Sequence, residues 1–482
     1  MFTRLHSWFS KVELALVIVI QAVAVLFFAL AIPSIQYSFI GDEYAFYNFA
    51  REIAEGRRSE SFFSLNGVYG QDPVLGSCYQ AAIMRLLGTH IYAWKFSSIV
   101  IIFPLGILTF YTIKTLLNAE VAFLALLITD TSFYYHHFFQ IGYLNNLSLF
   151  WLSVLLYLLV RIDFTDAKTL PRHLVLLGIV CGLSWYFYIG KLFFVVIALF
   201  LGVMLWRQPR RWRNLGLYLL PVIALIALSI LSTSHGSGNY GLAKSVLHRE
   251  YSDTGQLFKN MGHGFILSVY TSSPSHYLPT NSYLDKFTGL AALIGEALLI
   301  FQLVSRRGDE GHRKVILFFV VLCFAIGLTS PYPYPPTSRG IHYVPFYIVF
   351  ACYMFSLLAR RLKRHWPIAF YAALCCLIVS INARYIAQPL PLNTTQQILA
   401  DLRQMENQRI LLVETPSHFN LSNVRTLAEG YRLPNAVDLS TETPAPDVHA
   451  EYDYVFANSP LPYPASKIKE YNDGVILYSP RM

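Results

Sequence analysis

Long apolar stretches constrain the fold of this chain more than any other feature of its sequence. About eleven of them recur along 482 residues, and each is close to the length that a helix needs to cross a hydrocarbon core of about 30 Å. They cover residues 12–32, 93–117, 121–138, 144–160, 174–189, 192–206, 215–231, 287–304, 315–330, 342–358 and 367–386. Only 13% of the residues are charged, against about a quarter in a soluble domain. The sequence therefore predicts an α-helical polytopic membrane protein with about eleven transmembrane helices.

Basic residues lie between these stretches and indicate how the chain is oriented. If Arg4 and Lys11 are cytoplasmic, alternation of the spans places every later basic cluster on the same side, as the positive-inside rule requires. These clusters lie at residues 207–213, 306–314 and 360–364. The net charge of +9 thus reflects membrane topology, and we expect no binding of nucleic acid. This orientation predicts a multi-pass protein of a bacterial inner or plasma membrane, with its functional site on the extracytoplasmic face.

Two domains follow from this topology. Residues 1–390 form the predicted membrane domain, with outer loops at 33–92 and 232–286, and its first apolar stretch is longer than a signal-peptide core, so we expect a retained anchor. In residues 391–482, helix-like and strand-like segments alternate, which predicts a small extramembrane α/β domain. The helix-like segments are 394–406 and 423–431, and the strand-like ones are 409–413, 452–456 and 475–478. The tail has no glycine-rich phosphate loop, so we expect it to support or recognise rather than catalyse.

An acidic pair, Asp42 and Glu43, lies shortly after the first apolar stretch. It opens residues 43–55, whose apolar positions recur at the spacing of an amphipathic helix, and residues 74–87 repeat that pattern. Both predicted helices belong at the membrane surface. Asp42 is therefore either a helix cap, with Glu43 as a first-turn acid, or the base of an enzyme whose substrate is held in lipid.

Several polar residues at the predicted outer ends of apolar stretches are candidates for contact with a substrate. They are His136, Asn145, Lys191, Arg339, His342 and Tyr343. His136 either caps a helix end at the interface or contacts substrate, and Lys191 either extends its amine to the interface or binds a lipid phosphate. The planar guanidinium of Arg339 suits a phosphate. We expect no metal site here, because His136 and His137 are adjacent and point about 100° apart on a helix. No cysteine pattern indicates zinc or disulfides either.

The order of these motifs resembles the polyprenyl-phosphate-sugar-dependent GT-C glycosyltransferases, near the protein O-mannosyltransferases and the aminoarabinose transferases of lipid A. The resemblance is carried by Asp42-Glu43-Tyr44 and by residues 50–56, 73–76, 86–88, 182–191 and 339–345. It implies a GT-C fold, with Asp42 as the catalytic base and Glu43 assisting. The chain departs from the family pattern in two places: Asn145 and Asn146 stand where an acid is frequent, and Gln71-Asp72-Pro73 replaces a His-Pro-Pro pattern.

The predicted reaction transfers a sugar from a polyprenyl phosphate to the hydroxyl of a glycan, lipid or protein acceptor, with inversion. The leaving group is a stable phosphate anion, so one carboxylate can accept the acceptor's proton while cations hold the phosphate, and no general acid is needed. The predicted partners are therefore a polyprenyl-linked sugar, an acceptor and membrane lipids. The sequence identifies no cofactor and leaves open whether a divalent cation takes part.

Two alternatives remain at this point. A transporter or lipid flippase would show internal repeats, helices broken at mid-membrane and several buried ionisable residues. The sequence has no clear repeat, and Glu296 is the acid that lies clearly in the middle of an apolar stretch. An assembly protein that acts through its tail is the third hypothesis, and truncation after Ile386 separates it from the other two.

Overall fold

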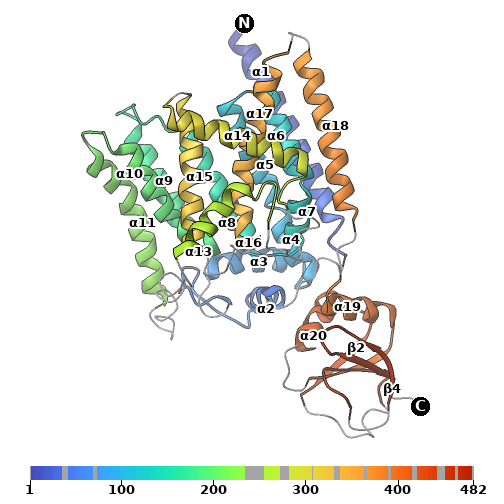
Figure 1. The fold of residues 1–482 in the computed structure, drawn as a ribbon. Helices are drawn as coiled ribbons and strands as arrows, with labels where there is room; N and C mark the ends of the chain where they lie inside the picture. The colour runs from blue at the N-terminus through green and yellow to red at the C-terminus, as the bar shows by residue number, and fades with distance from the viewer. Residues whose placement is uncertain are drawn as a thin grey trace.

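The protein is a bundle of helices with a small sheet domain at one end (Figure 1). The computed structural model describes residues 2–34, 42–68, 73–233, 254–271, 282–306, 308–329, 337–362, 366–388, 392–414, 421–441, 451–461 and 465–479. Seven spans within these residues are long and apolar enough to cross a membrane. They are formed by α1 (Phe2–Ala29), α4 (Ile91–Ile99) together with α5 (Ile102–Leu116), α11 (Arg211–Thr233), α14 (Lys286–Val304), α15 (Glu310–Leu328), η4 (Ile341–Tyr343) together with α17 (Val344–Ala359), and α18 (Trp366–Ile386).

Shorter helices complete the bundle. Four of these shorter segments are apolar: α3 (Val74–Leu87), α8 (Asn145–Arg161), α9 (Leu170–Ser184), and the 3-10 helix η3 (Tyr188–Leu192) running into α10 (Phe193–Leu205). The others are α2 (Asp42–Ala54), α6 (Ala119–Thr131), α7 (Phe133–Phe139), α13 (Thr254–Ile266) and α16 (Thr337–Gly340). The predicted helical membrane fold is confirmed, while the count of eleven crossings stays a prediction.

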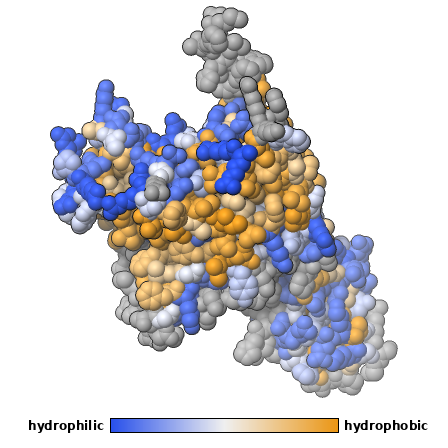
Figure 2. Space-filling view, turned by 45° about the horizontal axis from the view of Figure 1, so that its top comes forward, coloured by the Kyte–Doolittle hydropathy of each residue, from blue (hydrophilic) through white to orange (hydrophobic). Residues whose placement is uncertain are grey.

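The face of the bundle shown in Figure 2 carries a broad belt of hydrophobic surface, with hydrophilic residues gathered beyond it and on the sheet domain. Large apolar side chains are exposed on its outer helices, among them Leu220 at 73% and Ile368 at 74%. Exposure on this scale would be unfavourable in water, so this surface is the one that faces lipid.

Two of the predicted spans are each divided between two α-helices. The stretch 121–138 ends as α6 at Thr131, and α7 starts afresh after Ser132, whose hydroxyl accepts a hydrogen bond from the Tyr135 amide at 3.3 Å. The stretch 93–117 divides into α4 and α5 at Val100 and Ile101. A capping hydroxyl therefore interrupts the first of these stretches, whereas no side-chain cap accompanies the break at Val100 and Ile101.

Polar contacts within the bundle join neighbouring helices. Gln21 of α1 donates to the carboxylate of Asp130 in α6 at 2.7 Å, and both side chains are buried. Lys114, near the end of α5, pairs with Glu13 in the first half of α1. Glu296 lies within α14 and is only 2% exposed, so that span keeps its acid inside the bundle. In a membrane such contacts supplement van der Waals packing between helices.

The tail folds as a five-stranded mixed sheet with two helices. These elements are α19 (Thr394–Gln404), β1 (Arg409–Val413), α20 (Leu421–Gly430), β2 (Ala436–Ser440), β3 (Tyr454–Ala457), β4 (Ser466–Glu470) and β5 (Ile476–Ser479). The strand order is β2-β1-β3-β5-β4; β1 is parallel to β2 and β3, and the pairs β3-β5 and β5-β4 are antiparallel. The predicted α/β tail is confirmed, and the sequence analysis missed the two edge strands β2 and β4.

The two ends of the bundle differ in character. α2, α3 and the sheet domain lie at one end, and the connections α10–α11, α14–α15 and α17–α18 lie at the other (Figure 1). Those three connections carry the basic clusters at residues 207–213, 306–314 and 360–364. The arrangement thus matches the charge distribution that the positive-inside rule predicts, with α2 on the side away from the basic clusters.

Candidate active site

The helix α2 begins at the predicted acidic pair, Asp42 and Glu43. Its apolar side packs on α3, and the ring of Phe46 lies 6.0 Å from that of Tyr143, which precedes α8. A cavity of about 280 Å³ opens along its other side, lined by Ala45, Asn48, Phe49, Glu52, Arg58, Gly67 and Val68. Asp42 is the first residue of α2, one turn before Ala45. The side chains of Asp42 and Glu43 lie outside the described part of the chain, so their catalytic roles stay predictions.

The turn before α8 is held by a side chain of α3, which a side chain of α4 supports in turn. Gln80 of α3 donates to the carbonyl of Gly142 at 2.7 Å, and the indole of Trp94 in α4 donates to Gln80 at 3.1 Å. Gly142 has a φ of 81°, and a Cβ there would lie 2.6 Å from the Trp94 ring. Glycine is required at this position for both reasons. The helices α3 and α4 therefore fix where α8 begins.

The N-terminal end of α8 is where several predicted site residues meet. The 3-10 helices η3, which carries Lys191, and η4, which carries His342, both pack against α8, whose first residue is Asn145. Arg339 lies two residues before η4 in α16, and its guanidinium donates to the carbonyl of Thr329 at 2.6 Å. The structure thus gathers Asn145, Lys191 and the segment 339–342 at one end of one helix.

His342 is fixed in one orientation at this point. Its Nδ1 lies 2.9 Å from the carbonyl oxygen of Arg339, and its Nε2 lies 2.8 Å from the hydroxyl of Ser148 in α8. A carbonyl can only accept, so Nδ1 carries the proton, while the single hydroxyl hydrogen of Ser148 lies within reach of both Nε2 and the Asn145 carbonyl, the latter at 2.8 Å. The ring is fully buried against Phe193. His342 therefore joins the segment after Arg339 to the first turns of α8.

Two predicted contact residues point into helix packing instead. The ring of His136 lies 5.2 Å from Phe27 and 5.1 Å from Phe28, both on α1. The ring of Tyr343 lies 5.9 Å from Phe319 of α15 and packs there fully buried. The structure does not bring these two rings together with the residues at the start of α8, and their roles in substrate binding stay predictions.

Asn146 is a polar residue of the site that the sequence analysis did not select. It is the second residue of α8, it is fully buried, and neither its amide oxygen nor its amide nitrogen has a hydrogen-bond partner among the described residues. Leaving a buried polar group unsatisfied costs about 1–3 kcal/mol. In the sequence, only its position beside Asn145 indicated a role for Asn146. That its amide is buried without a hydrogen-bond partner among the described residues is seen only in the structure.

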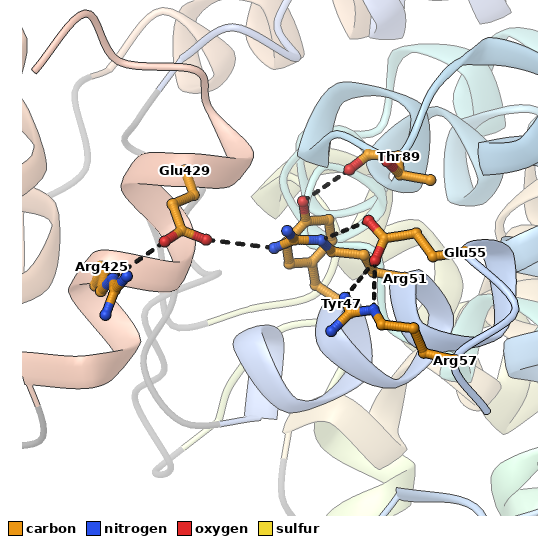
Figure 3. Close-up of polar contacts among 7 residues, drawn as sticks. All are labelled: Tyr47, Arg51, Glu55, Arg57, Thr89, Arg425 and Glu429. Atoms are coloured by element: carbon orange, nitrogen blue, oxygen red, sulfur yellow. Dashed lines mark hydrogen bonds and ion pairs between the residues drawn. The ribbon is translucent and has the colours of Figure 1, made fainter. Parts of the chain in front are cut away.

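The sheet domain is fastened to α2 by a chain of polar contacts (Figure 3). Arg51 of α2 donates to Glu55 at 3.0 Å and reaches Glu429 of α20 at 3.5 Å. Glu429 also accepts from Arg425 at 3.1 Å. The hydroxyl of Tyr47 donates to the carbonyl of Thr89 at 3.1 Å, and burial raises the pKa of this hydroxyl to about 12. α2 is thereby tied both to the first outer loop and to the sheet domain.

A second set of contacts joins α4 to the sheet domain. The amine of Lys95 is buried and donates to the hydroxyl of Tyr431 at 2.8 Å, and Tyr92 donates to the Tyr431 carbonyl at 3.2 Å. His90 caps α4 by accepting the Ala93 amide at 3.2 Å. Burial, together with the nearby charge of Arg432, lowers the pKa of His90 below its ordinary value. These contacts hold the domain against α4, and its supporting role stays a prediction.

No group of three or more histidine, cysteine, aspartate or glutamate side chains is placed to hold a metal ion within the described ranges. The carboxylates of Asp42 and Glu43 lie outside those ranges, so whether a divalent cation takes part stays open. The side chains that the site does present are amides, hydroxyls, an imidazole and two cations.

The chain is similar to known proteins both in part of its sequence and in its fold. Residues 71–232 match the family described as Dolichyl-phosphate-mannose-protein mannosyltransferase. The fold is similar to that of ArnT from Cupriavidus metallidurans bound to undecaprenyl phosphate, with a TM-score of 0.58 and 10% identity over 98% of each chain. It is also similar to the Archaeoglobus fulgidus oligosaccharyltransferase in the apo form, with a TM-score of 0.53 and 10% identity over 93% of this chain and 70% of that one. No curated protein matches the chain in sequence.

These similarities bear on the fold and on the hypotheses drawn from the sequence. The predicted GT-C fold and the resemblance to GT-C glycosyltransferases are confirmed. The family match supports the predicted enzyme class, a glycosyltransferase that uses a lipid-linked sugar, over a transporter or an assembly protein.

Proposed function

Because the chain has the GT-C fold and matches a mannosyltransferase family over residues 71–232, we propose that it transfers a sugar from a polyprenyl phosphate to an acceptor hydroxyl. The acceptor is a glycan, a lipid or a protein, and the reaction takes place on the extracytoplasmic face with inversion. The observation that carries the proposal is the polar cluster at the start of α8, which lies beside α2 at the end of an otherwise apolar bundle. The undecaprenyl phosphate bound to the Cupriavidus ArnT supports the class of donor.

Asp42 acts as the base in this proposal. It stands at the start of α2, next to the cavity of about 280 Å³ that runs along that helix. A carboxylate there can take the proton of an acceptor hydroxyl that enters from the aqueous side, as the hydroxyl oxygen attacks the anomeric carbon. Glu43 assists by orienting the acceptor. Attack from the side opposite the departing phosphate inverts the anomeric configuration.

The departing phosphate is held by the cations near α8. Lys191 and Arg339 carry the positive charge, and fixed cations in a site away from bulk water stabilise charge that develops on a leaving group. Asn146 supplies an amide donor and an amide acceptor to the sugar hydroxyls, which satisfies the groups that lack partners in the described part of the chain. The polyprenyl chain lies against the hydrophobic belt of the bundle.

The class of donor can be tested with purified protein in detergent. Radiolabelled polyprenyl-phosphate sugars and soluble nucleotide sugars are each incubated with a membrane lipid extract, and labelled products are separated from donor. We expect transfer from a polyprenyl-phosphate sugar and none from any nucleotide sugar, because lipid contacts supply donor affinity. Transfer from a nucleotide sugar would contradict the proposal. Movement of labelled donor across vesicles without any product would favour the transport hypothesis.

A further inference from the structure

A second cavity lies at the end of the bundle opposite α2, among the basic clusters. Its volume is about 510 Å³, and it lies where α10 ends and where α14 turns into α15. Its lining includes Val203, Arg207, Leu303, Arg306, Glu310 and Arg313. The proposed transfer reaction uses none of these residues.

Three arginines give the cavity its charge. Within the described residues Arg207, Arg306 and Arg313 form no ion pair with an acid, and the Nε of Arg313 is buried without a hydrogen-bond partner. The one acid in the lining, Glu310, pairs with the buried Lys314 at 2.7 Å. The acid therefore pairs with Lys314 rather than with an arginine. The cavity presents three arginines whose charge no acid of the described residues neutralises.

The rest of the lining is apolar and continues into the lipid-facing surface. Val203 is 57% exposed, and Met204, Leu303 and Leu317 complete this wall. Hydrophilic residues gather at this end of the molecule, directly above the hydrophobic belt (Figure 2). The cavity thus opens where a headgroup would meet the acyl chains of a bilayer.

The backbone at Arg306 supports a binding role for its side chain. Its φ is 55°, in the left-handed region that glycine or asparagine adopts at lower cost. The turn has a glycine two residues later, at Gly308, with a φ of 94°. An arginine at a strained position is consistent with a side chain that is needed there.

We propose that this cavity binds the headgroup of an anionic phospholipid from the leaflet on the side of the basic clusters. The phosphate accepts hydrogen bonds from Arg207, Arg306 and Arg313, and the acyl chains lie along Val203 and Leu303. Guanidinium groups form bidentate hydrogen bonds with phosphate, and basic pockets between transmembrane helices bind anionic headgroups. The site binds a structural lipid, separate from the donor lipid at α2.

The test compares two triple variants with the same change in net charge. The first, Arg207→Gln/Arg306→Gln/Arg313→Gln, removes the cavity arginines. The second, Arg213→Gln/Arg360→Gln/Arg361→Gln, removes three exposed arginines of the same end that do not line the cavity. Delipidated wild type and both variants are titrated with phosphatidylglycerol or phosphatidylcholine, and bound lipid is counted by native mass spectrometry.

We expect the wild type and the second variant to retain phosphatidylglycerol over phosphatidylcholine, and the first variant to bind it at least about tenfold more weakly, since three charge-assisted contacts are lost. Equal losses in both variants would mean that general surface charge attracts the lipid, and would overturn the proposal. Inorganic phosphate at millimolar concentration should not displace the lipid. Displacement by phosphate alone would show that the apolar wall contributes nothing, which would also contradict a lipid site.

Discussion

Replacement of Asn146 by leucine tests whether its amide serves the substrate or the fold. Leucine has the same branched shape without polar atoms, so it removes the unmet hydrogen-bonding groups. That removal relieves a penalty of about 1–3 kcal/mol, part of which the larger methyl groups offset by crowding. We expect Asn146→Leu to unfold with a free energy equal to that of wild type or about 1 kcal/mol higher.

Asn382 of α18 offers a matched control, because it is also buried but has its partners. Its amide oxygen accepts from the Phe133 amide at 3.2 Å, and its amide nitrogen donates to Asp285 at 3.1 Å. Asn382→Leu leaves the Phe133 amide and the Asp285 carboxylate without these partners, so we expect a loss of about 2–3 kcal/mol in unfolding free energy. The two identical substitutions should therefore change stability in opposite directions, or at least by clearly different amounts.

The transfer reaction should respond differently from stability. Loss of hydrogen bonds between Asn146 and the sugar should lower kcat/KM of Asn146→Leu by about 10- to 100-fold. Thermal unfolding in detergent and the initial rate of label transfer are measured on the same preparations. A destabilised Asn146→Leu protein that transfers sugar at the wild-type rate would refute the reasoning, since the amide would then be structural.

Three further predictions concern the contacts around the first outer loop. Gly142→Ala should cost about 2–4 kcal/mol in unfolding free energy and reduce transfer, because its positive φ and the neighbouring indole leave no room for a methyl group. Because the pKa of His90 is lowered in the folded protein, the unfolded chain protonates this imidazole more readily. The free energy of unfolding should therefore fall as the pH drops below 6.5, the ordinary pKa of histidine. Thermal scans of His90→Asn at several pH values should not show this fall. Tyr431→Phe should lower the melting temperature more than Glu429→Gln does, because it removes a partner of the buried Lys95, whereas the 3.5 Å contact of Glu429 is partly exposed.

Periodicity predicted the helices of this chain well where capping residues accompanied it. The predicted helix 74–87 is found with those bounds, since Pro73 precedes it and Gly88, with a φ of 104°, ends it. The predicted helix 43–55 is found as Asp42–Ala54. The break at Ser132 was missed because hydropathy does not register a cap inside an apolar stretch.

The edge strands of the sheet domain were missed for a physical reason. β4 is exposed at every position and carries two lysines, and β2 has no residue that is fully buried. β4 lacks the alternation of apolar and polar residues, and its charges discourage pairing with other chains, whereas β2 has only two apolar residues beside Asp438 in its alternating part. The inner strands β1 and β3 were predicted because their burial leaves an apolar pattern.

The site could be predicted only in part. Lys191 and His342 were selected as isolated polar residues between apolar runs, but their meeting at α8 depends on helix packing between segments about 150 residues apart. Asn146 was missed because a single sequence does not reveal that both ends of an amide lack partners. The contact of α2 with the sheet domain joins Arg51 to Glu429, and no local sequence pattern predicts a contact between residues so far apart in the chain.

The central claim is that Asp42 serves as the base in transfer from a polyprenyl-phosphate sugar. Its most direct test measures label transfer and release of free polyprenyl phosphate by wild type, Asp42→Asn and Asp473→Asn, the last being the same change at an exposed turn of the sheet domain. We expect wild type and Asp473→Asn to form product, while Asp42→Asn binds donor and forms none. Product formation by Asp42→Asn at the wild-type rate would show that Asp42 is not the base.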